Sequence, residues 1–179
     1  LHGARAQAGM MHPGRDLRAV IFDLDGTLID TADDFVPVVQ QLRAEAGLDP
    51  IAAERIRATV SNGARALVAL ALDTNEDDAS FETHRLRLLD LYGTILGRHA
   101  RPYPGVRDLL DTLNRRGIAW GVATNKPRAF TGPLLEMLGL DAGSVVCPED
   151  VTHRKPDPES LQRACGELRC DPTEAVYIG

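Results

Sequence analysis

The stretch that decides the fold runs from Val20 to Leu28 and reads Val-Ile-Phe-Asp-Leu-Asp-Gly-Thr-Leu. An apolar run that ends in turn-forming residues is typical of a buried strand followed by a tight loop. Side chains alternate along a strand, so Asp23 and Asp25 should leave the strand end close together. Because open α/β sheets bind ligands beyond the carboxyl ends of their strands, the two aspartates are candidates for a functional site.

Two neighbouring carboxylates repel each other unless a cation or a proton lies between them. Mg²⁺ suits such a setting because it prefers oxygen ligands and keeps water molecules that a phosphate can replace. The spacing also suits Asp23 as a nucleophile and Asp25 as a general acid and base. Asp-x-Asp-Gly can also be an ordinary turn, since Asp and Gly both favour turns, but the flanking apolar residues favour the functional interpretation.

Strand patterns alternate with helical patterns over much of the chain. Strands are expected at residues 19–23, 118–123, 144–147 and 175–178. Apolar residues between them recur at helical spacing, as in Val106, Leu109, Leu110 and Leu113. This alternation predicts an α/β fold with a Rossmann-like parallel sheet.

Residues 31–103 interrupt the alternation, because they contain helical stripes and no convincing strand. The interval is too long for one loop between a strand and a helix. We therefore expect an all-helical insertion at 31–103 and a discontinuous α/β core at 18–30 and 104–179. Such an insertion is well placed to act as a lid, and residues 1–17 are expected to be a disordered or tag-derived tail.

Two further polar clusters follow expected strands. Thr124 and Asn125 come after the second strand, where a hydroxyl and an amide can bind a phosphate oxygen; plain helix capping is the alternative. Lys155 follows the third strand in a proline-rich loop and offers a point charge for phosphate; an exposed loop lysine is its alternative. Parallel strands bring these loops to one sheet edge, and therefore close to Asp23 and Asp25.

Composition excludes several classes of function. The chain has 179 residues, 44% of them hydrophobic, and a net charge of −6, which argues against a nucleic-acid partner. The longest apolar run, residues 66–72, is too short to span a membrane. The three cysteines, Cys147, Cys165 and Cys170, are odd in number and form no Cys-x-x-Cys pair, so we expect reduced thiols in a cytoplasmic protein. We also expect the protein to be a monomer or a homodimer.

The three polar clusters, at Asp23 and Asp25, at Thr124 and at Lys155, resemble in this order the first three signatures of the haloacid dehalogenase-like phosphohydrolase superfamily. The resemblance implies a Rossmann-like core with a helical cap, and Mg²⁺ as the cofactor, held at Asp23 and Asp25. It implies a phosphatase that acts on a small phosphorylated metabolite through an aspartyl-phosphate on Asp23. The loop amides near Leu24 and Gly26 would then hold the phosphate.

Within the superfamily, the chain resembles the phosphoglycolate phosphatase-like group. The stretches 60–67, 120–127 and 147–150 resemble the branch of that group that acts on N-acetylmuramic acid 6-phosphate. The resemblance implies that Ser61, Asn62 and Arg65 of the cap face the site. Arg65 would pair with a substrate carboxylate, although a solvated arginine is its alternative.

The resemblance stops at Gly179, where the sequence ends. In the superfamily an acidic pair follows such a strand and glycine and completes the Mg²⁺ site. We therefore interpret the chain as a C-terminally truncated form of a longer enzyme, with weak Mg²⁺ binding and low turnover. A sugar phosphomutase and a non-catalytic binding domain are the alternative functions, whereas a dehalogenase is disfavoured because it needs no acid at Asp25.

Overall fold

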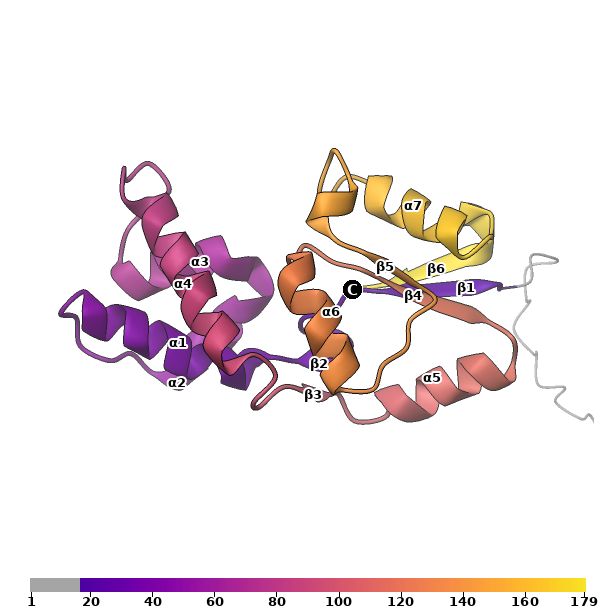
Figure 1. Cartoon of the computed structure of the whole chain (residues 1–179), viewed down its shortest axis with the longest axis horizontal. Helices are drawn as coiled ribbons and strands as arrows, with labels where there is room; N and C mark the ends of the chain where they lie inside the picture. The colour runs from indigo at the N-terminus through magenta and orange to yellow at the C-terminus, as the bar shows by residue number, and fades with distance from the viewer. Residues whose placement is uncertain (1–16) are drawn as a thin grey trace, which may run out of the picture.

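The computed structural model describes residues 17–179. The expected tail, residues 1–17, lies outside this range except for Leu17. The remaining chain forms a sheet-containing part and a helical part that lie at opposite ends of an elongated molecule (Figure 1).

The sheet has four strands: β1 (Ala19–Phe22), β4 (Ala119–Ala123), β5 (Ser144–Val146) and β6 (Ala175–Ile178). Their order is β5-β4-β1-β6, and all neighbours are parallel. All four expected strands are confirmed to within a residue at each end, and so is the α/β fold class. Because β1 is a central strand, its carboxyl end delivers Asp23 to the middle of the sheet edge.

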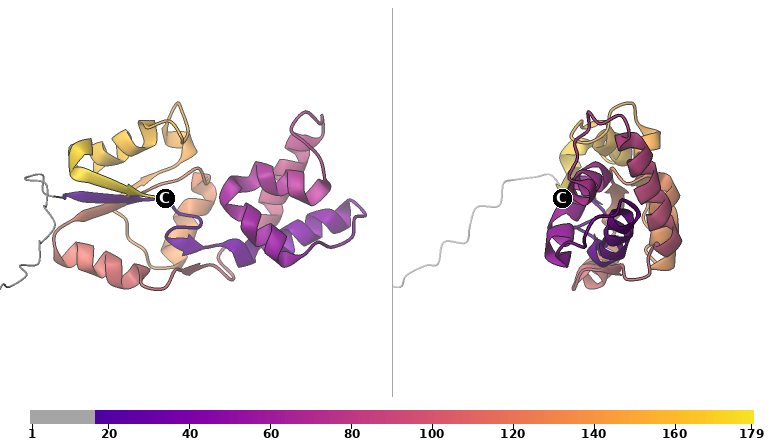
Figure 2. Two further views of the ribbon diagram at one scale, coloured as in Figure 1. Left: turned by 180° about the vertical axis from the view of Figure 1, so that it is seen from behind. Right: turned by 90° about the vertical axis from the view of Figure 1, so that its left-hand side faces the viewer.

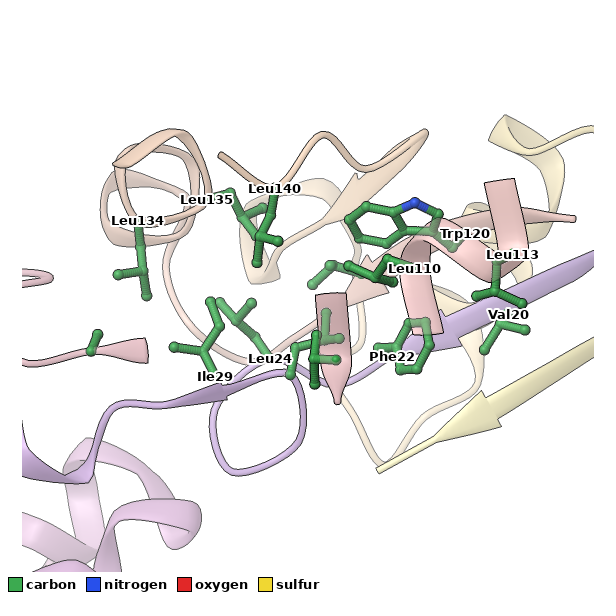
Figure 3. Packing of buried hydrophobic residues seen from close by; sticks show 14 residues of the cluster. Val20, Phe22, Leu24, Ile29, Leu110, Leu113, Trp120, Leu134, Leu135 and Leu140 are labelled. Atoms are coloured by element: carbon green, nitrogen blue, oxygen red, sulfur yellow. The ribbon is translucent and has the colours of Figure 1, made fainter. Parts of the chain in front are cut away.

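Helices cover both faces of the sheet (Figure 1). On one face lie α5 (Val106–Arg115) and α6 (Arg128–Met137), and on the other lies α7 (Glu159–Glu167). Alternation along β1 explains the two layers, since Val20 and Phe22 pack with α5 while Ile21 packs against α7. Figure 3 shows the apolar cluster that contains Val20 and Phe22. In it, the Trp120 and Phe22 rings meet edge to face, with their centroids 6.5 Å apart.

The helical part, which we call the cap, contains α1 (Ala32–Glu45), α2 (Ala53–Thr59), α3 (Gly63–Leu72) and α4 (Phe81–Ile95). It has its own apolar cluster, whose fully buried members include Leu67 and Leu88. The left-hand view in Figure 2 shows the cap as a unit beyond the end of the sheet. No helix within residues 17–179 is both long and apolar enough to cross a membrane.

A small antiparallel ribbon joins the two parts. It pairs β2 (Ile29–Asp30) with β3 (Arg101–Pro102), where the chain enters and leaves the cap. Buried Asp34 supports this joint, because its carboxylate accepts the backbone amides of Gly97 at 2.9 Å and His99 at 2.7 Å.

Three of these elements, β2, β3 and α2, were not expected. The expectation of no strand over residues 31–103 was wrong for β3. This strand has only two residues, too few to show an alternating pattern, and its partner β2 is distant in the sequence. Helix α2 was missed because only Ile56 of its seven residues is buried, which leaves no apolar stripe.

The three cysteines are free thiols. Cys147 and Cys165 are buried, and Cys170 is half-buried. Burial, together with nearby Cys170, raises the pKa of Cys165 to about 11, so this thiol stays protonated at neutral pH. Cys147 and Cys165 are therefore packed as predicted, whereas the reduced state stays a prediction.

Candidate active site

A cavity of about 680 Å³ lies between the carboxyl edge of the sheet and the cap. The loops after β1, β4 and β5 form its core side, as parallel topology predicts. Its polar lining from the core comprises Asp23, Asp25, Thr124, Asn125, Lys126, Glu149, Arg154 and Lys155. Its polar lining from the cap comprises Ser61, Asn62, Arg65, Glu82, Arg85 and Tyr92.

Asp23 is oriented by two donors on one carboxylate oxygen. Its Oδ1 accepts the amide of Leu24 at 2.7 Å and lies 2.8 Å from the Nζ of Lys155. Lys155 also donates to the hydroxyl of Tyr177 at 3.0 Å. The Oδ2 of Asp23 makes no hydrogen bond within residues 17–179, so one oxygen remains available for chemistry.

The loop after Asp23 is closed by backbone hydrogen bonds. The Gly26 amide donates to the Ile29 carbonyl at 3.0 Å, and the Ile29 amide donates to the Leu24 carbonyl at 3.0 Å. Gly26 has φ +80°, and a Cβ there would lie 2.8 Å from Oγ of Ser61 in the cap. The positive φ therefore favours glycine at this turn, and a Cβ there would also displace the Ser61 hydroxyl. In this structure the Leu24 and Gly26 amides have partners, so their phosphate-binding role remains a prediction.

The Asp25 side chain has partners from two other segments of the chain. Its Oδ1 accepts the hydroxyl of Thr31 at 2.8 Å, and its two oxygens lie 3.1 and 3.3 Å from Nζ of Lys126. Lys126 in turn donates to the hydroxyl of Tyr92 on α4 at 2.8 Å. Both aspartates therefore have a lysine ammonium within hydrogen-bond distance.

Lys126 was not predicted as a site residue, although it directly follows Thr124 and Asn125, which were. A usable signal was present in the composition. The chain contains 18 arginines but only two lysines, Lys126 and Lys155. Each of them is paired with one of the two aspartates of the site.

Thr124 and Asn125 organise the loop after β4. Buried Thr124 accepts the amide of Lys126 on Oγ1 at 3.1 Å, and Asn125 Nδ2 donates to the Lys155 carbonyl at 3.1 Å. The first contact closes the loop and does not cap a helix, because α6 begins at Arg128 and its N-cap residue Pro127 makes no side-chain cap hydrogen bond. Since a hydroxyl that accepts one hydrogen bond still has its proton to donate, its phosphate-binding role stays a prediction.

Charged residues form the cap wall of the cavity. Arg65 lies 2.5 Å from Glu76 and 4.0 Å from Glu82, and its guanidinium stacks 5.2 Å from the Phe81 ring centroid. The hydrogen bond with Glu76 raises the pKa of Arg65 and lowers that of Glu76. Arg65 thus faces the cavity but already has an acidic partner.

The turn before α3 supplies the other predicted cap residues. Ser61 and Asn62 lie in the 3-10 turn Val60–Asn62, and both are exposed on the cavity wall. On the opposite, core side stands Arg154, which sequence reasoning did not select. It makes no ion pair or side-chain hydrogen bond within residues 17–179.

The donors around Asp23 fit a hard divalent cation. The Asp23 Oδ2 and the backbone carbonyl of Asp25 accept no hydrogen bond from residues 17–179, and Mg²⁺ is commonly held by one or two carboxylates plus water and phosphate. The Asp25 carboxylate itself is engaged by Thr31 and Lys126.

A second group of potential metal ligands lies outside the cavity. Within residues 17–179, it is the one group of three or more such side chains, and consists of His153, Asp157 and Glu159. Both carboxylates already accept backbone amides of this loop, so the group is explained by loop structure.

Comparisons with known proteins agree with this geometry. A family model for haloacid dehalogenase-like hydrolases matches residues 20–179. The N-acetylmuramic acid 6-phosphate phosphatase of Pseudomonas aeruginosa is 45% identical, over 91% of this chain and 73% of that protein. A phosphoglycolate phosphatase of Xanthomonas campestris is 36% identical, over 90% and 74% of the two chains.

The crystal structure of a predicted phosphoglycolate phosphatase from Haemophilus somnus has a TM-score of 0.78 and 24% identity, and covers 91% of this chain and 76% of that one. This similarity bears on the fold alone. The family model, by contrast, covers nearly all of the described residues, and the resemblance drawn from the three motifs is confirmed. The chain therefore belongs to the haloacid dehalogenase-like hydrolase family, and within that family it groups with the phosphatases.

Proposed function

We propose that this protein hydrolyses a small phosphate monoester and that its substrate is N-acetylmuramic acid 6-phosphate. The observation that carries the proposal is the pair of aspartates at one cavity, each held by a lysine. The substrate is suggested by the name of the relative that is 45% identical. The cavity volume of about 680 Å³ also suits a sugar phosphate, since ligand pockets commonly measure about 300–1,000 Å³.

In the first step, a carboxylate oxygen of Asp23 attacks phosphorus and the bond from phosphorus to the sugar oxygen breaks. The product is a phosphoryl group bound to Asp23. Asp25, protonated at this stage, gives its proton to the departing sugar oxygen, which leaves as an alcohol. Lys155 lies next to Asp23, so its charge offsets the repulsion between this carboxylate and the dianionic phosphate.

In the second step, water attacks the phosphoryl group on Asp23, and Asp25 takes the proton from that water. The bond between Asp23 and phosphorus breaks, which releases inorganic phosphate and restores both side chains. Mg²⁺, held by the Asp23 carboxylate and the Asp25 carbonyl, would supply positive charge to the phosphate oxygens. Thr124 and Asn125 would donate hydrogen bonds to those oxygens.

The test is the release of phosphate, with Mg²⁺, from N-acetylmuramic acid 6-phosphate, phosphoglycolate and glucose 6-phosphate. We expect the highest kcat/KM for the first. Asp23→Asn, which is nearly isosteric, should keep the fold and release no phosphate, because an amide cannot form the intermediate. An isomerised sugar phosphate without free phosphate would identify a phosphomutase instead, and phosphoryl transfer to another residue would overturn the assignment of Asp23.

A further inference from the structure

The environment of Lys126 is unusual for a lysine. Its side chain is only 4% exposed. The ammonium donates to Asp25 and to the hydroxyl of Tyr92, and it lies 4.4 Å from the ring centroid of Tyr92 and 5.5 Å from that of Phe35. Within residues 17–179, the hydrogen-bond, ion-pair and ring partners of this ammonium are thus a carboxylate, a phenol and two aromatic faces, all of which stabilise positive charge.

These neighbours come from both parts of the molecule. Lys126 and Asp25 belong to core loops, whereas Phe35 is on α1 and Tyr92 is on α4 of the cap. The Phe35 and Tyr92 rings are stacked, with centroids 4.3 Å apart and an interplanar angle of 8°. Phe130 of core helix α6 meets the Tyr92 ring edge to face at 5.3 Å. The ammonium thus lies where the cap contacts the core.

Tyr92 is suited to accept a hydrogen bond from this cation as a neutral phenol. Burial raises its pKa well above the ordinary value, and the charges of Asp25 and Asp34 act in the same direction. The hydroxyl therefore stays protonated and offers its oxygen to Lys126. Thr31, at the entrance to the cap, donates to the same Asp25 oxygen.

We propose that Lys126 is a positioning residue for Asp25, and that Tyr92 holds Lys126 so that the docked cap sets the orientation of the acid–base carboxylate. The inference rests on the proposed phosphatase activity. It does not extend to Asp23, whose partners Leu24 and Lys155 both lie in the core. The consequence is that a change in the cap should alter proton transfer to the leaving group without altering nucleophilic attack.

The kinetic test uses Tyr92→Phe, which removes one hydroxyl and keeps the stacked ring. With a sugar phosphate, kcat should fall about tenfold at unchanged KM, a fraction of the 10²–10⁴ typical of general acid–base catalysis. With 4-nitrophenyl phosphate, whose leaving group needs no proton, kcat should change less than twofold. Tyr103→Phe in the linker after the cap is the matched control and should change neither rate. An equal loss with both substrates would overturn the proposal.

A double-mutant cycle on kcat identifies the residue through which Tyr92 acts. In an Asp25→Asn background, Tyr92→Phe should cause no further loss, because the group that it positions is already inactive. Additive losses would refute action through Asp25. Thr31→Val, which removes the other hydroxyl partner of Asp25, provides a second variant with the same expected dependence on the leaving group.

A readout that is independent of activity comes from the two lysines. Protein labelled with ¹³Cε-lysine should give two side-chain signals, and Lys126→Arg assigns them by removing one. Tyr92→Phe should shift the Lys126 signal and leave the Lys155 signal in place. A shifted signal with an unchanged ratio of the two rates would make the contact merely structural and would refute the proposal. Absence of phosphate release from any monoester by the unmodified enzyme would refute the proposed function instead.

Discussion

The core and the cap contribute to the site in different ways. In the core, Asp23, Thr124 and Lys155 follow the ends of parallel strands, so the sheet itself brings their loops together. In the cap, the cavity is lined by helix surfaces and one turn, and their charged side chains pair with each other as well as facing the cavity. The core thus fixes the reacting groups, whereas the cap forms the wall opposite them.

The two aspartates make the same contrast at atomic scale. Asp23 is held entirely by core residues, but Asp25 is held by Thr31 and, through Lys126, by Tyr92 of the cap. The lesson is that one carboxylate can be independent of the cap while its neighbour, two residues on, depends on it.

The largest expected effect concerns the core side. Lys155→Met should lower kcat about 10²–10³-fold, the loss typical of removing one group that stabilises charge in the transition state. Because Lys155 acts at Asp23 and the phosphate, the loss should be the same for sugar and nitrophenyl phosphates. Steady-state kinetics with both substrates checks this, and a loss confined to poor leaving groups would break the distinction between the two lysines.

Next in size is a change in the cap interior. Leu88 is fully buried in the cap cluster, so Leu88→Ala should lower the free energy of unfolding by about 2–5 kcal/mol. Because the cap has its own cluster, helix loss measured by circular dichroism should begin at lower denaturant than the change in fluorescence of Trp120, the single tryptophan, which is buried in the core.

Leu110→Ala, in the core cluster, is the matched control for Leu88→Ala. It should shift the Trp120 transition to lower denaturant as well as the helix signal. Coincident transitions in the Leu88→Ala protein would show that the cap and the core unfold as one unit.

A smaller effect is expected at the cavity wall. Arg65→Ala should raise KM about tenfold for phosphates that carry a carboxylate, which corresponds to one charge-assisted hydrogen bond of about 1.5 kcal/mol. Phosphates without a carboxylate should be unaffected. Glu76→Gln should lower KM for the same substrates, because it frees Arg65 from its partner.

Arg154→Ala is the comparison for Arg65→Ala, since Arg154 faces the cavity from the core and lies beside Lys155. Initial rates over the same panel measure both variants. If Arg154→Ala and not Arg65→Ala shows the carboxylate-dependent rise in KM, carboxylate recognition belongs to the core.

The smallest effect concerns the cap surface. Glu45 pairs with Arg87 of α4, and this hydrogen bond lowers the pKa of Glu45 from 4.5 to about 2. A carboxyl whose pKa is lowered on folding stabilises the protein above its unfolded pKa and loses that contribution as the pH falls through the folded one. Glu45→Gln should therefore lower the Tm slightly at neutral pH, and the difference from the unmodified protein should shrink between pH 4.5 and 2.

Much of the fold followed from local patterns. Strands β1 and β4 were visible because buried parallel strands are continuous apolar runs, and α5 because Val106, Leu110 and Leu113 lie on one helical face. The ribbon of β2 and β3 was not visible, because two-residue strands carry no period. Helix α2 escaped for a similar reason, since a single buried residue, Ile56, makes no stripe.

The sequence by itself determined the centre of the site. Asp23, Thr124 and Lys155 were selected because each follows a strand, and parallel strands deliver their carboxyl ends to one edge. Only the tertiary structure decided that Lys126 pairs with Asp25, 101 residues away, and that Arg65 faces Glu76. The physical reason is that such pairs depend on how the cap packs against the core and on side-chain direction. Neither is encoded in local periodicity, which reports only the face of an element that is buried.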